Sequence, residues 1–212
     1  RWDSLSAGNQ ATFDAIGVSL TGVVLAQLIV SVLGVLIVTS EYSTGMIRAS
    51  LAAVPRRLML LTGKIVVSGA VALAASLSAC FLAFLLGQVI LGDHGVTLGS
   101  SDAMRAILGA AFYLTSISVI ASAIGFIVRS TAGGIAATLG LLLVLPILGQ
   151  VLPYKWVNDI LDYLPSSAGM AIYSTPSDST ASISATSGVI ALIVWMVVSI
   201  AGAAFVLVRR DA

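Results

Sequence analysis

The sequence predicts an all-α, polytopic membrane protein: a helical bundle with five visible spans. Of its 212 residues, 58% are hydrophobic and only 9% are charged, whereas soluble domains carry roughly 25% charged residues. Five runs contain no Asp, Glu, Lys, Arg or His. Each is long enough to cross a hydrocarbon core of about 30 Å as a helix, which takes about 20 residues. The runs do not alternate as barrel strands of about 10 residues would, so helices are favoured.

The five predicted spans form one transmembrane domain over residues 1–212. They lie at about 16–38, 65–91, 106–128, 132–152 and 188–208. The second run is longer than a span needs, so we expect it to tilt, to kink or to project from the membrane. The remaining segments are short, and none is large enough for a soluble domain.

Basic residues favour the cytoplasmic side of a membrane, and they orient the spans. Threading the chain through five spans puts seven basic residues on one side and three on the other. The cytoplasmic set is Arg48, Arg56, Arg57, Lys64, Arg129, Arg209 and Arg210; the external set is Arg1, Arg105 and Lys155. The C-terminus is therefore predicted to be cytoplasmic and Arg1 external. An external start without a signal peptide predicts one more span upstream, six in the native protein.

The sequence offers little for catalysis or cofactor binding. It has no GxxxxGK[ST] phosphate loop, so it is not expected to bind ATP in that way. His94 is the only histidine and Cys80 the only cysteine, so we expect neither a catalytic site nor a metal site. The net charge of +1 gives no case for nucleic-acid binding. Uncharged spans also argue against an ion-coupled carrier, because such carriers need charged or titratable groups at membrane depth.

The connection at 39–63 is the most informative segment. Ser43 or Thr44 is suited to cap a helix that runs to about Ala53, and Pro55 favours a turn into the next helix. The apolar face of this helix would be Ile47, Leu51 and Val54. The pattern predicts a short amphipathic helix on the inner membrane surface, with Arg56 and Arg57 near lipid phosphates. It is either a handle for a cytoplasmic partner or an interfacial connector.

This segment, SEYSTGMIRASLAAVPRRLMLLTGK, resembles the one after the second span in permeases of the type-2 ABC transporter family, particularly actinobacterial ones. The matching positions are Glu41, Tyr42, Thr44, Gly45, Arg48, Pro55, Arg56 and Arg57. A later run, YLPSSAGMAI at 163–172, resembles the segment before the last span of that family.

The resemblance implies a permease of six helices in the plasma membrane, paired with a second identical or homologous permease and with two ATPase subunits. Those subunits would hold ATP and Mg. The short helix would be a coupling helix that docks on the ATPase. Its coupling residues would be Glu41, Tyr42, Thr44, Gly45, Met46, Ile47, Arg48 and Leu51. Glu41 would pair either with a basic group on the ATPase or with one on its own loop.

Two short external helices are predicted over 154–173, separated at Pro165, with Ser166 as the cap of the second. They are either re-entrant helices that close the outer end or a lipid-surface helix anchored by aromatic residues. In the family such helices lie near the exit path. This reading makes an external gate of Trp156, Leu164, Pro165 and Ser166.

Polar and small residues inside the spans predict helix contacts. Gln27 lies mid-span and is expected either to bond to a neighbouring helix or to contact substrate. Small residues repeat every four positions, which allows close helix packing in lipid. They are Ser68, Ala72, Ser76 and Cys80 on the second run, Ala121 and Gly125 on the third, and Ala136 and Gly140 on the fourth.

The function expected from these features is export of a hydrophobic or amphipathic compound, driven by separate ATPase subunits. The alternatives are a non-transporting membrane sensor or scaffold that uses the same handle and, less favoured, an ion-coupled carrier.

Overall fold

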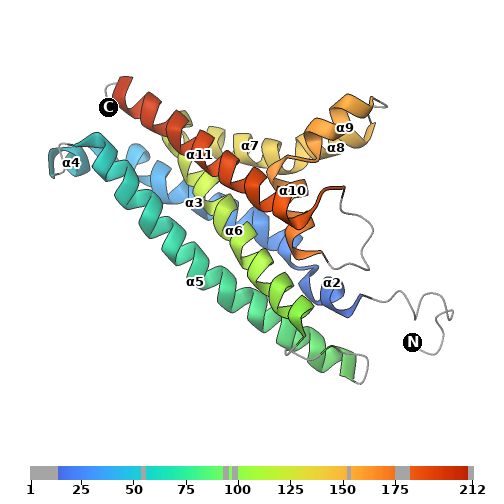
Figure 1. Ribbon diagram of the computed structural model, residues 1–212. Coiled ribbons are helices and arrows are strands. Elements are labelled where there is room, and N and C mark those ends of the chain that lie inside the picture. Colours follow the sequence, from blue (N-terminus) through green and yellow to red (C-terminus); the bar gives the residue numbers. More distant parts are fainter. Residues whose placement is uncertain are drawn as a thin grey trace.

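The computed structural model describes residues 14–53, 56–92, 96, 100–151, 154–174 and 182–209. All regular elements of these residues are helices. Five helical stretches are long and apolar enough to cross a membrane. They pack side by side as one bundle (Figure 1). The predicted fold class, an all-α multi-pass membrane bundle, is confirmed.

The first span is two helices in series, α2 (Ala15–Leu20) and α3 (Val23–Ser43). Asp14 is the N-cap of α2: its Oδ1 accepts a hydrogen bond from the backbone amide of Ile16 at 3.1 Å. The interruption falls at Thr21 and Gly22, where glycine weakens the helix. α3 continues past residue 38, the predicted end of the span, through polar residues. The Thr39 hydroxyl bonds back to a carbonyl within the helix.

The second span, α5 (Arg57–Leu91), has 35 residues and is therefore about 52 Å long at 1.5 Å per residue. The short helix α4 (Met46–Ala53) precedes it. α3 and α5 each extend several residues into the predicted connection of 39–63. Charged residues there continue the two helices and do not form a loop.

The third and fifth spans are α6 (Ser101–Val128) and α11 (Ala185–Arg209). Both are longer than predicted. The extra first turn of α6 has a local cause: the Ser100 hydroxyl accepts a hydrogen bond from the amide of Ala103 at 3.2 Å. Asp102 also lies in that turn, where a negative charge is favoured by the helix dipole.

The fourth span changes its winding midway. It consists of α7 (Thr131–Leu139), a π-helical turn η3 (Gly140–Val144) and α8 (Leu145–Val151). Pro146 follows the π turn. In a helix, proline lacks an amide hydrogen and its ring clashes with the carbonyl four residues earlier. The extra residue in the wider π turn relieves this clash.

Two short helices follow at the predicted place. They are α9 (Lys155–Leu161) and α10 (Pro165–Tyr173). Pro165 is the first residue of α10 and Leu164 is its N-cap. The prediction that Ser166 caps α10 is wrong: proline occupies the first position, where its fixed φ suits a helix start, and Ser166 lies inside the helix.

α6 is the centre of the bundle. In its most apolar 18-residue window 72% of the residues are buried, against 22–33% in the other four spans. It contacts α3, α5, α7, α10 and α11. The outward faces of the other spans expose large apolar side chains such as Val66, Val71 and Val197, which suits contact with lipid tails.

Most of the predicted small-residue stripes are packing faces. On α5, Ser68, Ala72, Ser76 and Cys80 are all buried. On α6, Ala121 and Gly125 are buried as well. On α7 the prediction is wrong, because Ala136 is exposed and nothing lies within 4 Å of a Cβ atom added at Gly140. Gly134 and Thr138 are the buried residues there.

Gly34 marks the closest approach of α3 to α6. A Cβ atom added at Gly34 would lie 2.6 Å from the Ser118 carbonyl oxygen. The Ser122 hydroxyl donates to the Gly34 carbonyl at 3.0 Å. The backbones are therefore in direct contact, as small residues permit within membranes.

We expect Gly34→Ala to lower stability by about 1–3 kcal/mol, because the added methyl group overpacks a backbone contact. The measurement is thermal unfolding in detergent micelles. Gly63→Ala is the matched control, because nothing lies within 4 Å of the Cβ position at Gly63. Alanine there should raise stability by about 1 kcal/mol, since it has a higher helix propensity than glycine. Equal midpoints for the two variants would contradict this account of the α3–α6 contact.

Candidate functional site at the α4 end of the bundle

The α4 end of the bundle, where α4 contacts α3 and α5 and where α11 also ends (Figure 1), holds the predicted coupling residues. Side-chain hydroxyl groups satisfy a backbone carbonyl in the last turn of α3. The side chains of Ser43 and Thr44 donate to the Ser40 carbonyl at 2.9 and 2.8 Å. Gly45 follows with a φ of +72°, a conformation that glycine adopts without steric cost. Ser43 and Thr44 therefore terminate α3, which corrects their predicted role as caps of α4.

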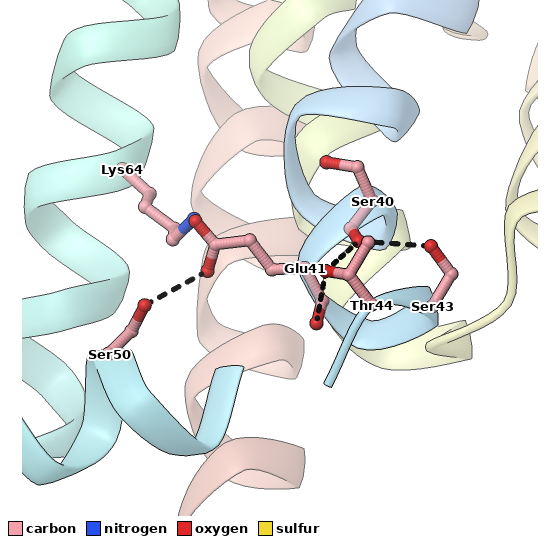
Figure 2. A network of polar contacts seen from close by, with 6 residues as sticks. All are labelled: Ser40, Glu41, Ser43, Thr44, Ser50 and Lys64. Carbon is pink, nitrogen blue, oxygen red and sulfur yellow. Dashed lines mark hydrogen bonds and ion pairs between the residues drawn. The ribbon is translucent and has the colours of Figure 1, made fainter. Parts of the chain in front are cut away.

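Glu41 joins three helices. One oxygen of its carboxylate forms an ion pair with Lys64 of α5, and the other accepts a hydrogen bond from the Ser50 hydroxyl of α4 at 3.4 Å. Figure 2 shows this network from close by. The Lys64 and Glu41 side chains are 18% and 24% exposed, so the pair is partly shielded from water. The sequence left two kinds of partner open for Glu41, a basic group on the ATPase or one on its own loop. The structure shows a partner on the same chain, Lys64.

α4 presents two different faces. Ile47 is 5% exposed and packs inward, whereas Met46 is 58% exposed. Ala49, Ala52 and Ala53 are also exposed. The side chains of Arg48 and Leu51, and residues 54–55 with Pro55, lie outside the described part. Three of the four α4 side chains described as exposed are thus alanines, whose small size allows another protein to approach the backbone.

Tyr42 forms a second contact set at this end. Its ring packs edge-on against Phe126 with centroids 6.4 Å apart, and the Arg129 guanidinium lies 5.5 Å from the ring centroid. Such cation–π contacts contribute about 0.5–2 kcal/mol. The Tyr42 hydroxyl is buried and has no hydrogen-bond partner among the described residues.

Arg129 and Arg57, one of the two predicted membrane-surface arginines, also connect helices. Arg129 caps α6 in a left-handed conformation, with a φ of +56°. Arg57 Nη1 donates to the Leu207 carbonyl at 3.1 Å and so links the start of α5 to the end of α11. Arg56 is exposed. Five predicted cytoplasmic basic residues, Arg56, Arg57, Lys64, Arg129 and Arg209, therefore lie at the same end of the bundle.

Gln27 lies in the bundle interior at 5% exposure. Its side-chain carbonyl accepts a hydrogen bond from the Tyr113 hydroxyl. This bond joins α3 to α6, so the predicted helix contact is present. Tyr113 is a partner that sequence reasoning did not single out, because 86 residues separate it from Gln27.

The predicted external gate residues do not form one cluster. Trp156 is 66% exposed and its ring lies beside Tyr154 on α9. Leu164 and Pro165 are buried. α10 packs against α6 and α11: a Cβ on Gly169 would meet the Tyr113 ring, and one on Gly188 would meet the Ala168 carbonyl. α10 is thus an internal helix of the bundle, while α9 is peripheral.

We expect Glu41→Gln to loosen α4 without unfolding the bundle. A partly exposed ion pair contributes about 1 kcal/mol, so amide exchange in α4 should become about fivefold faster while exchange in α6 stays unchanged. Combining Glu41→Lys with Lys64→Glu should restore slow exchange. Arg56→Gln is the control, as it removes an exposed charge nearby. Wild-type exchange in the Glu41→Gln protein would show that the pair does not hold α4.

Comparisons of the chain with family models, with curated proteins and with solved structures give no match, and the fold and site rest on the geometry described above.

Proposed function

We propose that this chain is the membrane-spanning permease subunit of an ATP-driven transporter of the type-2 ABC family. The observation that carries the proposal is the attachment of α4. Glu41 of α3 holds α4 through Ser50 and α5 through Lys64, so one short helix is fixed to the first two spans at once. A push on α4 would move both spans together.

The charge pattern supports a cytoplasmic position for α4. Arg56, Arg57, Lys64, Arg129 and Arg209 belong to the same end of the bundle, where Glu41 is the only acidic residue among those that the structure describes. Lys and Arg concentrate on the cytoplasmic side of membrane proteins. In the proposal the C-terminus is therefore cytoplasmic and the membrane is the plasma membrane.

In the proposed mechanism, two ATPase subunits hold ATP and Mg and dock on the exposed face of α4. Their closure moves α4, and α3 and α5 move with it against α6. A second permease, identical or homologous, would complete the translocation path. The apolar spans suit export of a hydrophobic or amphipathic compound, since no charged residue lies in the middle of any span.

A sensor or scaffold that binds another cytoplasmic protein through α4 is the second candidate. The same exposed face of α4, with Met46 at its start, would serve it. The two functions differ in whether the bound partner hydrolyses ATP.

We expect the full-length protein to co-purify with an ATPase encoded by a neighbouring reading frame, and the complex to hydrolyse ATP. Ala49→Glu should weaken this association at least tenfold, because it places a charge on the exposed face of α4. Thr186→Glu, an equally exposed position at the start of α11, should leave it unchanged. The measurements are quantitative pull-down and phosphate release in proteoliposomes.

Two results would argue against the proposal. Wild-type protein that purifies without any phosphate-loop ATPase would remove the energy source. Ala49→Glu protein with unchanged association and hydrolysis would mean that α4 is not the contact. Binding of a partner that does not hydrolyse ATP would favour the sensor or scaffold function.

A further inference from the structure

A cavity of about 740 Å³ lies between the start of α3, the π turn, α8, α9 and α10. Ligand pockets usually measure 300–1,000 Å³, so its size suits a drug-sized molecule. The π turn begins nine residues into the fourth span, roughly 15 Å along it at 1.5 Å per residue. The cavity therefore reaches from mid-span towards α9.

The helix irregularities of the chain border this cavity. Val24 lies directly after the break between α2 and α3, and Leu142 and Leu143 belong to the π turn. Pro146 follows on α8 and also lines the cavity. Irregular backbone at membrane depth is tolerated where it lines a cavity or is covered by protein, and π turns often occur at functional sites. Irregular stretches of the first and fourth spans therefore form part of the cavity wall.

α9 folds back over α8 and brings polar groups to the cavity. Gly149 permits this fold, because a Cβ there would lie 2.0 Å from Leu161 Cδ1. The polar lining consists of Asn158, Asp162, Ser166, Ser167 and Ser182. Among the described lining residues Asp162 alone is charged, and no ion pair involves it within the described part of the chain. The Ser166 hydroxyl is buried and lacks a hydrogen-bond partner among the described residues.

The apolar part of the lining comes mainly from the start of α3, the π turn and α8, with Val24, Leu142, Pro146 and Ile147. The end of α9 and the start of α10 meet near Asp162. Their partial charges, about half an elementary charge each and opposite in sign, offset one another. The carboxylate therefore sets the sign of the local field, and an apolar molecule with a positive charge is complementary to it.

We infer that this cavity is a binding site, within a single chain, for an amphipathic organic cation. Its apolar body lies against the π turn and α8, and its charge lies near the carboxylate of Asp162. Asn158 and Ser166 offer hydrogen bonds to polar atoms of the same ligand. That the bound cation is also the transported compound rests on the proposed function. Binding of the cation does not.

The test compares two ions of matched size and opposite charge, tetraphenylphosphonium and tetraphenylborate. Each is added to the purified full chain in neutral detergent, and binding is measured by equilibrium dialysis and by the shift of the thermal unfolding midpoint. We expect the cation to bind and to raise the midpoint, and the anion to bind at least tenfold more weakly. That ratio corresponds to about 1.4 kcal/mol.

Asp162→Asn should remove the preference for the cation while keeping side-chain size. Asp159→Asn is the matched control, because Asp159 is an exposed residue of α9, the helix that Asp162 follows as C-cap. The affinity of this variant for the cation should stay within twofold of wild type. Ser167→Phe fills the cavity and should weaken binding of both ions. Equal binding of the two ions by wild type, or equal affinities of the two Asp variants for the cation, would overturn the inference.

The outcome is separable from that of the transport proposal. Loss of cation binding with intact ATPase association would overturn this site and leave the proposed function standing. Cation binding that depends on Asp162, in a protein that associates with no ATPase, would leave the site standing and overturn the proposed function.

Discussion

The architecture depends on direct contact between α6 and its neighbours. Lipid tails are as apolar as leucine, so helices in a membrane gain little by hiding apolar side chains and associate through close packing and hydrogen bonds. α6 meets this demand with small and hydroxyl-bearing residues on every side. Gly34 approaches Ser118 through its backbone and accepts a hydrogen bond from Ser122. Tyr113 contributes both a ring against α10 and a hydroxyl bond to Gln27.

This centre connects the two ends of the molecule. At the α4 end, Phe126 of α6 packs against Tyr42 of α3. Towards the other end, Tyr113 of α6 supports α10, whose Ser166 lines the cavity. α3 likewise carries Glu41 at one end and Val24 at the other. A displacement of α3 against α6 would therefore change the α4 network and the cavity wall together, which is the physical connection that a driven transporter needs.

The sequence predicted the features that depend on composition and chain order. It gave the five spans, the basic end, and the positions of α4, α9 and α10. It did not predict helix ends: Glu41 and Lys64 read as loop residues, yet each neutralises the other and lets α3 and α5 continue. No local pattern reveals such a pair, because its partners lie on different spans. The π turn before Pro146 and the buried face of α7 were missed as well.

The length of α5 has a consequence for the whole membrane protein. At about 52 Å its 35 residues exceed the 40–45 Å of a bilayer with its headgroups, so α5 must lean or stand out of the surface. Since Lys64 of α5 is tied to Glu41, and Glu41 to Ser50 of α4, the height of α4 above the lipid follows the lean of α5. A thicker bilayer would hold α5 upright and draw α4 towards the headgroups, and a thinner one would raise α4. The distance of α4 from the headgroups therefore depends on bilayer thickness.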